Sequence, residues 1–213
     1  MIGDAEEAIL NDISDNKVPS TWRYAYHSIK PLNSWILDLI ARIEMFSEWA
    51  FKQQPAVFWI SGFTYPTGFT TALQQQAARK LMKPIDSLKW EFNYMPADTG
   101  NQTPAKEGAY VTGFFLEGAK WDNDKIVDAD PMTLHYSLPI VHFKPVDKAA
   151  KQANKNIKYY NCPCYMYPIR GGSKENPSYL FSIMLPMGQD PSGQIDENFW
   201  IKRGTACLLS LGD

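Results

Sequence analysis

The chain has 213 residues, of which 45% are hydrophobic and 14% aromatic, so it can bury a sizeable core and intrinsic disorder is excluded. Its 21 basic and 23 acidic residues nearly balance, which gives no net field to attract nucleic acid or an anionic membrane. Three cysteines, an acidic N-terminus and the lack of a run of about eighteen apolar residues argue against a disulfide scaffold, a signal peptide and a membrane span, and predict a cytosolic protein.

Residues 1–86 are predicted to form a helical subdomain. Residues 1–17 are polar and acidic, and we expect them to be flexible. The segment 18–31 is rich in aromatic residues and bounded by prolines, so we expect irregular or short helical structure there.

A long amphipathic helix is predicted over 34–53. Asn33 or Ser34 would serve as its N-cap, and Pro55 forbids its continuation. The helical period is carried by five apolar residues: Ile36, Leu39, Ile40, Ile43 and Phe46.

The stretch FWISGFTYPTGFTTALQQQAARK, residues 58–80, combines an aromatic, glycine-containing turn with a helical pattern. Its second half predicts a helix over 67–82 that stops at Lys83, because Pro84 disfavours the helical conformation in the residue before it. The aromatic half is compatible with a substrate loop or with a buried corner.

Residues 87–213 are predicted to form a small antiparallel β-barrel-like subdomain, so the fold class is α+β. Residues 88–94 alternate strictly between apolar and polar side chains, which indicates a strand. Further β-prone segments lie at 109–122, 139–146, 162–169, 178–186 and 199–211, and 147–158 is either a helical excursion or a mobile loop.

Motifs for nucleotide or metal chemistry are weak. GGSKEN, residues 171–176, lies between predicted strands and is better explained as a hairpin turn than as a phosphate loop, so we expect no nucleotide hydrolysis. One irregular pair, Cys162 and Cys164, with a distant Cys207, does not match the paired ligands of a zinc site. We expect buried, reduced thiols, no metal and no cofactor, and none of His27, His135 and His142 indicates a catalytic base.

Two polar groupings have alternative interpretations. Glu117, Asp122 and the adjacent Trp121 could form the carboxylate pair and aromatic platform of a glycosidase or carbohydrate-binding module, or could stabilise a turn and cover the mouth of a barrel. A row of lysines could contact an acidic surface such as tubulin or remain a solvated face; these are Lys144, Lys148, Lys151, Lys155 and Lys158.

The order of motifs resembles the C-terminal domain of dynein heavy chains, most closely the axonemal and flagellar members. The resemblance covers roughly residues 18–211 and is carried by KPLNSWILDLIARIEMFSEWA, QPAVFWISGFTYPTGFTTALQQQAARK, PIDSL, GAYVTGFFLEGAKWD, LPIVHFKP, YYNCPCY and FWIKRGTACLL. It implies a helical part and a small barrel on one face of an AAA+ ring, within a minus-end-directed microtubule motor driven by ATP. It also implies light and intermediate chains as partners in the parent complex, and a cytoskeletal location in a cilium or flagellum.

By the same resemblance the domain itself is non-catalytic, modulates the ring mechanically, and uses the FWISGF segment as a buried corner. An aromatic approach of Trp22, Tyr24, Tyr26 and Trp35 is then the expected contact surface. The residues that we take as the structural signature are Trp35, Asp38, Phe58, Trp59, Gly62, Phe63, Pro66, Phe69, Gln75, Arg79, Pro84, Ile85, Asp86, Gly113, Leu116, Glu117, Gly118, Trp121, Asp122, Cys162, Pro163, Tyr165, Arg203 and Gly204.

Overall fold

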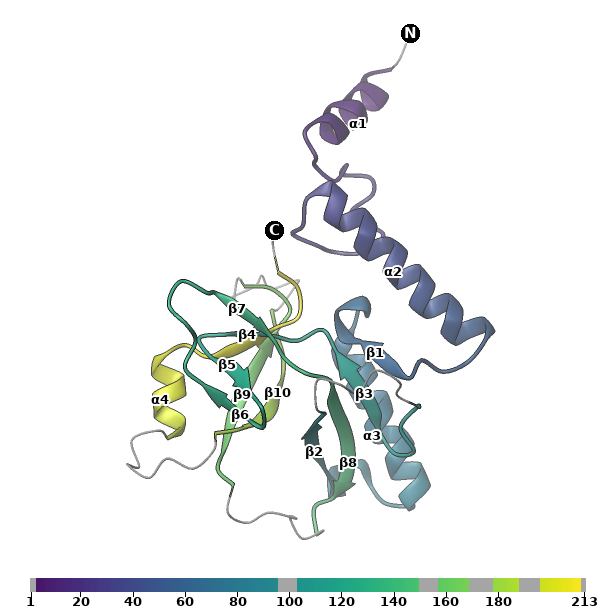
Figure 1. Ribbon diagram of the computed structural model, residues 1–213. Coiled ribbons are helices and arrows are strands. Elements are labelled where there is room, and N and C mark those ends of the chain that lie inside the picture. The colour runs from purple at the N-terminus through teal and green to yellow at the C-terminus, as the bar shows by residue number, and fades with distance from the viewer. Residues whose placement is uncertain (1–2, 96–102, 150–156, 169–177, 188–195, 212–213) are drawn as a thin grey trace.

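The structure is a computed structural model that describes residues 3–95, 103–149, 157–168, 178–187 and 196–211. Its helices α1 and α2 lie at one end of the molecule, and the sheets and the other helices form the body (Figure 1). The helices are α1 (Asp4–Ser14), α2 (Leu32–Phe51), α3 (Pro66–Leu81) and α4 (Glu197–Lys202), with short 3-10 turns at Ile60–Gly62 and Ile85–Ser87. Among the described residues, no helix combines the length and apolar character that a membrane crossing needs.

Two sheets and a hairpin make up the β part. One sheet has the order β1-β3-β8-β2, the other β10-β9-β11-β4-β7, and β5 pairs with β6. The strands are β1 (Val57–Trp59), β2 (Leu88–Tyr94), β3 (Ala109–Thr112), β4 (Phe115–Glu117), β5 (Lys120–Asp122), β6 (Lys125–Val127), β7 (His135–Ser137), β8 (Val141–Asp147), β9 (Tyr159–Tyr165), β10 (Tyr179–Pro186) and β11 (Ala206–Leu208).

The α+β class is confirmed, but the described strands form no closed barrel, and the barrel-like prediction is not confirmed. Gly113 and Gly118 explain much of the difference, because both have positive φ, at +98° and +75°. These turns divide the single strand predicted over 109–122 among both sheets and the hairpin. Purely antiparallel pairing is also wrong, since β1 runs parallel to β3 and β11 parallel to β9.

Several boundaries differ from the prediction for local reasons. The segment predicted as a strand over 199–211 begins inside α4, because the side chain of Asp196 accepts a hydrogen bond from the Phe199 amide at 2.9 Å and caps a helix. The helix predicted over 67–82 ends at Leu81, where Met82 adopts a left-handed conformation with φ of 53°. Residues 4–14 form α1, a helix that the sequence analysis did not predict and none of whose residues is buried.

The start of α2 shows a cap from a distant residue. The helix begins at Leu32, so neither Asn33 nor Ser34 is its N-cap. Instead, the backbone carbonyl of Asn16 accepts from the Leu32 amide at 2.9 Å, and its side-chain oxygen accepts from the Asn33 amide at 3.1 Å. Asn16 thus satisfies two of the amides that a helix leaves unpaired at its first turn.

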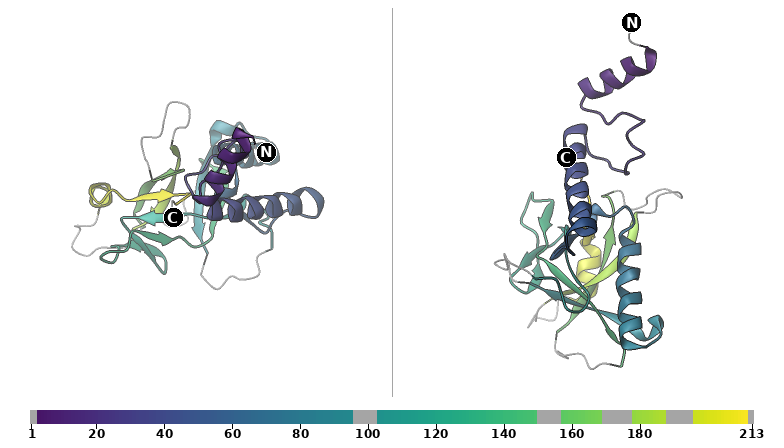
Figure 2. Two further views of the ribbon diagram at one scale, coloured as in Figure 1. Left: turned by 90° about the horizontal axis from the view of Figure 1, so that it is seen from above. Right: turned by 90° about the vertical axis from the view of Figure 1, so that its right-hand side faces the viewer.

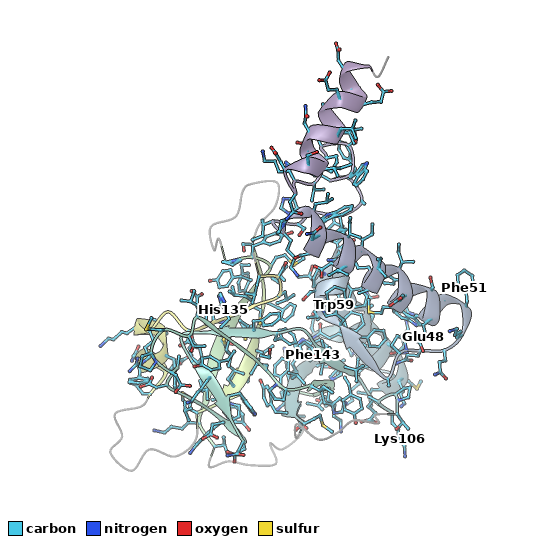
Figure 3. All side chains as sticks on the ribbon, turned by 45° about the horizontal axis from the view of Figure 1, so that its top comes forward. Glu48, Phe51, Trp59, Lys106, His135 and Phe143 are labelled. Atoms are coloured by element: carbon cyan, nitrogen blue, oxygen red, sulfur yellow. The ribbon has the colours of Figure 1, made fainter. Side chains whose placement is uncertain are left out.

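The main hydrophobic core joins the two halves of the sequence. Phe58, Ile60 and Phe69 from the first half are buried with Val111 and Phe143 from the second. Figure 3 shows Phe143 in the interior of the body, below α2. The proposed boundary between subdomains 1–86 and 87–213 stays a prediction, although β1 crosses it to pair with β3.

Replacing Gly113 with alanine should destabilise the fold. A Cβ at this position would lie 2.7 Å from Cδ1 of Trp59, and the φ of +98° is unfavourable for any other residue. We expect the free energy of unfolding to fall by about 2 kcal/mol in urea titration.

Gly68→Ala is the matched control. Gly68 lies in helix α3, and a Cβ added there would have its nearest neighbour, the Cβ of Tyr65, at an ordinary contact distance of 3.6 Å. There we expect a gain of up to about 1 kcal/mol from helix propensity. Equal losses in both variants would contradict the assigned role of Gly113.

Candidate interaction surface

Helix α2 has apolar side chains on two sides, and its inner side contacts the aromatic corner. Successive residues turn by about 100°, which places Trp35, Leu39, Arg42, Phe46 and Trp49 on one side. The ring centroid of Trp49 lies 4.9 Å from that of Phe58, and the centroid of Phe46 lies 5.5 Å from that of Phe63. These edge-to-face contacts fix the C-terminal half of α2 against the corner.

Arg42 is the polar anchor of this contact. Its side chain is only 8% exposed, and its terminal nitrogens donate to the backbone carbonyls of Gly62 at 2.5 Å and Ser61 at 2.6 Å. The guanidinium also lies 4.0 Å above the ring of Tyr26. Burial lowers the pKa of Arg42, while Tyr26 and Asp38 oppose that shift.

A second small core holds the N-terminal end of α2. Tyr26 and Trp35 stack with centroids 5.1 Å apart, and the Tyr26 hydroxyl donates to the Trp35 carbonyl at 2.5 Å. Burial and the charge of Asp38 raise the pKa of Tyr26 to about 12. The expected aromatic contact surface is therefore wrong in part, because Tyr26 and Trp35 are buried, whereas Trp22 and Tyr24 are exposed.

The outer side of α2 is exposed and apolar. We call Ile36, Leu37, Ile40, Ile43 and Phe51 the α2 stripe; they lie within about 120° of one another around the helix axis. Leu37 is 67% exposed, Ile43 56% and Phe51 85%. Figure 3 shows Phe51 at the far end of α2, pointing away from the sheets. Exposed Glu44 and Ser47 separate Phe51 from the isoleucines. Large apolar residues exposed together on one side of a helix still mark a candidate interaction site.

Comparison with known proteins assigns the family. The sequence profile described as the C-terminal domain of the dynein heavy chain matches residues 1–209, nearly the whole length. The protein belongs to this family of dynein C-terminal domains. The resemblance predicted from the sequence motifs is confirmed.

Similar proteins are named axonemal and flagellar dyneins. The domain is 46% identical over 209 residues to dynein axonemal heavy chain 2 of Mus musculus, which covers 96% of the domain and 4% of that protein. It is 44% identical over 208 residues to the Dynein-1-beta heavy chain, flagellar inner arm I1 complex, of Chlamydomonas reinhardtii, again 96% of the domain and 4% of the relative. The domain thus spans about one twenty-fifth of the length of these relatives.

The predicted signature residues of the dynein domain do not gather at one site. Phe58, Phe63 and Phe69 do meet in the corner, where the Phe63 and Phe69 centroids are 4.4 Å apart. The rest are distributed along the fold, and their role as a signature stays a prediction: Trp35 and Asp38 on α2; Trp59, Gly62 and Pro66 around the corner; Gln75 and Arg79 on α3; Pro84, Ile85 and Asp86 before β2; Gly113, Leu116, Glu117, Gly118, Trp121 and Asp122 from β3 to β5; Cys162, Pro163 and Tyr165 on β9; Arg203 and Gly204 after α4.

The residues of the alternative carbohydrate site are partly committed to the fold. The Trp121 ring lies 4.5 Å from the Tyr94 ring, and its indole nitrogen donates to the Asn123 carbonyl at 3.1 Å. Glu117 lies in β4 opposite Ala206. A sugar platform needs an open ring face, and Tyr94 covers part of this one.

The cysteines are buried, as expected from the sequence. Cys162, Cys164 and Cys207 are fully buried free thiols, and the Cys162 and Cys207 sulfurs are 3.6 Å apart. Burial raises the pKa of Cys162 and Cys164 well above the ordinary value. In the described part of the protein, no group of three or more His, Cys, Asp or Glu side chains could hold a metal.

Two of the histidines make contacts with residues far away in the sequence. His27 Nδ1 lies 2.6 Å from the Tyr167 hydroxyl, and His142 Nε2 lies 2.7 Å from the Glu107 carbonyl. These contacts tie segments together. The GGSKEN turn, Lys151 and Lys155 lie outside the described residues.

Arg42→Ala should destabilise the dynein domain strongly. The change removes two charge-assisted hydrogen bonds and leaves the Gly62 and Ser61 carbonyls buried without this donor. We expect the free energy of unfolding to fall by about 3 kcal/mol, measured by urea titration. Arg79→Ala, at an exposed position on α3, should stay within about 0.5 kcal/mol of the unaltered protein. Similar values for the two variants would refute the anchoring role.

Trp121→Ala tests the alternative carbohydrate site. Because the ring is half-buried and packs on Tyr94, we expect a loss of about 2 kcal/mol, below the value for a fully buried aromatic ring. Soluble oligosaccharides should leave the tryptophan fluorescence of the unaltered protein unchanged. A loss under about 1 kcal/mol together with fluorescence protection by a glycan would favour the sugar platform instead.

Proposed function

We propose that this domain is a non-catalytic module that packs on the AAA+ ring of its own heavy chain through the α2 stripe and modulates ATP-driven, minus-end-directed movement along microtubules. The single observation that carries the proposal is the outward apolar side of α2, which the rest of the described structure leaves exposed. The relatives are about 25 times longer, so most of the parent protein lies outside this domain.

The position of α2 supports this contact. Figure 2 shows α2 extending outward from the body in both views, and its right-hand view shows α1 beyond the N-terminal end of α2. The isoleucines of the stripe are about half exposed, so each one that a partner covers stabilises the contact by about 1 kcal/mol. A stripe of five large apolar residues can therefore hold a module in place without a polar site.

The anchoring of α2 explains how such a contact could influence the motor. Arg42 and the aromatic corner hold the helix on the body, so a shift of the partner surface is transmitted to the whole domain. A module shifts an equilibrium only by as much as its contacts differ between the states. The proposed modulation thus needs α2 to fit one ring conformation better than another.

The names of the relatives support a location in the axoneme of a cilium or flagellum. Light chains, intermediate chains and microtubules are proposed partners of the parent complex, reached through the full heavy chain. Catalysis of ATP hydrolysis is assigned to the parent protein and not to this domain, since its sequence has no phosphate-binding loop motif.

Charge substitution on the α2 stripe should change motility while leaving ATP hydrolysis in place. In the full heavy chain, Ile40→Glu with Ile43→Glu puts two carboxylates into the proposed interface, and we expect docking to weaken by about 3 kcal/mol or more. Single-molecule measurement should show an altered run length or stall force with ATPase activity retained. These substitutions leave the fold of the domain in place. Deleting residues 88–213 would not, because it removes β3 and exposes the core that Phe58 shares with the strands.

The matched control is Met132→Glu with Leu134→Glu, two exposed apolar residues on the loop between β6 and β7. It adds the same charge at a site away from α2, and motility should stay as in the unaltered motor. Unchanged force and run length in the α2 double variant would refute the modulation. Complete loss of ATPase in a folded α2 variant would show that this domain supplies something that hydrolysis requires.

A further inference from the structure

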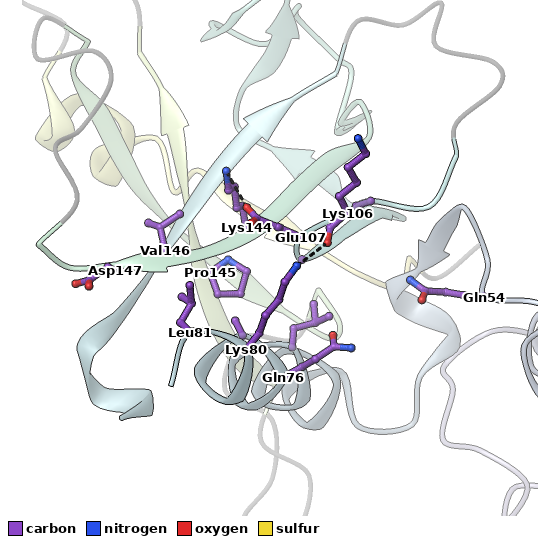
Figure 4. A pocket seen from close by; sticks show the side chains of 14 residues that line it. Gln54, Gln76, Lys80, Leu81, Lys106, Glu107, Lys144, Pro145, Val146 and Asp147 are labelled. Atoms are coloured by element: carbon purple, nitrogen blue, oxygen red, sulfur yellow. Dashed lines mark hydrogen bonds and ion pairs between the residues drawn. The ribbon is translucent and has the colours of Figure 1, made fainter. Parts of the chain in front are cut away.

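A hollow lies between α3 and β8, and none of the α2 stripe residues lines it. Its volume is about 410 Å³, and its apolar lining includes Leu73, Ala77 and Leu81 of α3 with Pro145 and Val146 of β8. Figure 4 shows the side chains of this hollow between the helix and the strand. A volume of this size falls within the range of ligand-binding sites.

Three lysines from separate elements surround this apolar lining. Lys80 comes from α3, Lys106 from the segment before β3, and Lys144 from β8. Lys144 pairs with Glu107 at 3.2 Å, and the Lys80 ammonium donates to the Lys106 carbonyl at a long 3.5 Å, as drawn in Figure 4. Neither Lys80 nor Lys106 has an ion-pair partner among the residues that the structure describes.

The local charge remains positive after pairing. Among the described residues that line the hollow, Lys80, Lys106 and Lys144 stand against the carboxylate of Glu107, while Asp147 at the edge is paired with Lys83. Like charges gathered around a partly enclosed apolar surface repel one another and attract an anion.

A second hollow continues the site. It has a volume of about 530 Å³, shares Lys80, Lys106 and Lys144 with the first, and extends to Tyr110 and His142. The lysines therefore stand between two adjoining hollows. A ligand that uses both must be extended, with its acidic groups at the lysines and its apolar groups on either side.

The wall that carries Lys106 is held against the sheet. Gly108 has φ of +71°, and a Cβ there would overlap the Phe143 backbone carbonyl. The backbone at Gly108 therefore packs against β8 more closely than any other residue would allow. His142 Nε2 lies 2.7 Å from the Glu107 carbonyl on the same segment. The backbone next to Lys106 is thus fixed in place, which lowers the backbone entropy lost on binding.

We propose that these joined hollows bind an acidic peptide segment of a partner protein, with carboxylates paired to Lys80, Lys106 and Lys144 and an apolar side chain seated against Leu73, Ala77 and Pro145. Both hollows open to solvent, and an apolar centre with a charged rim is the arrangement of a peptide or protein interface. Lysine ammonium groups act as point charges that accept carboxylates in varied geometry, as an extended acidic segment requires.

The probe is a fluorescein-labelled peptide of about ten residues that alternates glutamate and leucine, titrated with the 213-residue protein by fluorescence anisotropy. We expect saturable binding that weakens as salt rises from about 50 to about 300 mM, because ion pairs near the surface are screened. Lys80→Gln with Lys106→Gln should weaken binding at least about tenfold. Ala77→Phe, which fills the first hollow without a change of charge, should also weaken it.

Controls separate this site from general charge attraction. Lys202→Gln, at an exposed position on α4, should change the affinity by less than about twofold. A peptide with glutamine in place of every glutamate should not bind, and free glutamate at about 10 mM should not compete. Circular dichroism must show that each variant is folded, and Lys106→Gln alone serves if the double variant is not.

The proposal is overturned by an absence of binding at about 1 mM protein, or by equal losses in the Lys80/Lys106 and Lys202 variants. Equal affinity for the glutamine peptide would exclude recognition of the acid. Full competition by free glutamate would assign the hollow to small anions in place of a peptide.

Discussion

The hydrogen bonds from Arg42 to the carbonyls of Ser61 and Gly62 are the constraint on which the arrangement of the helices depends. The Ser61 hydroxyl in turn donates to the carbonyls of Gly113, between β3 and β4, and Leu209, just after β11. One polar network therefore runs from α2 through the corner to the sheets. A buried guanidinium without these acceptors would destabilise the fold by several kcal/mol. The inner side of α2 is therefore committed to the body, and its outer side is available to a partner.

The two halves of the sequence depend on each other for the same reason. Strand β1, at the corner, pairs in parallel with β3 from the second half of the sequence. Phe58, Ile60 and Phe69 of the first half are buried in the same core as residues of the strands of the second half. The helical part cannot bury this surface alone. The dynein domain therefore presents α2 from a single packed body, and the exposed stripe is a property of that body as a whole.

The sequence predicted those features that depend on local periodicity or on one strong breaker. Strand β2 was predicted at its observed bounds, Leu88–Tyr94, because its alternation is strict, and α2 was found within two residues at each end because Pro55 limits it. The segment 199–211 failed because one capping aspartate outweighs the β propensity of an aromatic run. Periodicity also groups residues on a helix face without saying which face is covered, and no local signal connects Lys80, Lys106 and Lys144, which the fold brings together from distant positions.

The cap that Asn16 provides to α2 has a mechanical consequence. Asn16 lies between α1 and the segment that returns to Leu32, and two hydrogen bonds from one residue join these parts of the structure. A pull on α1 would load those two bonds before it reached the hydrophobic core, since α1 itself has no buried residue to share the tension. The first turn of α2 would then lose its cap, and the small core of Tyr26 and Trp35 would take the load next. Arg42, further along the helix, would still hold. Under load, the N-terminal end of α2 would thus give way in two steps, the cap first and the small core second, before the helix detached from the domain.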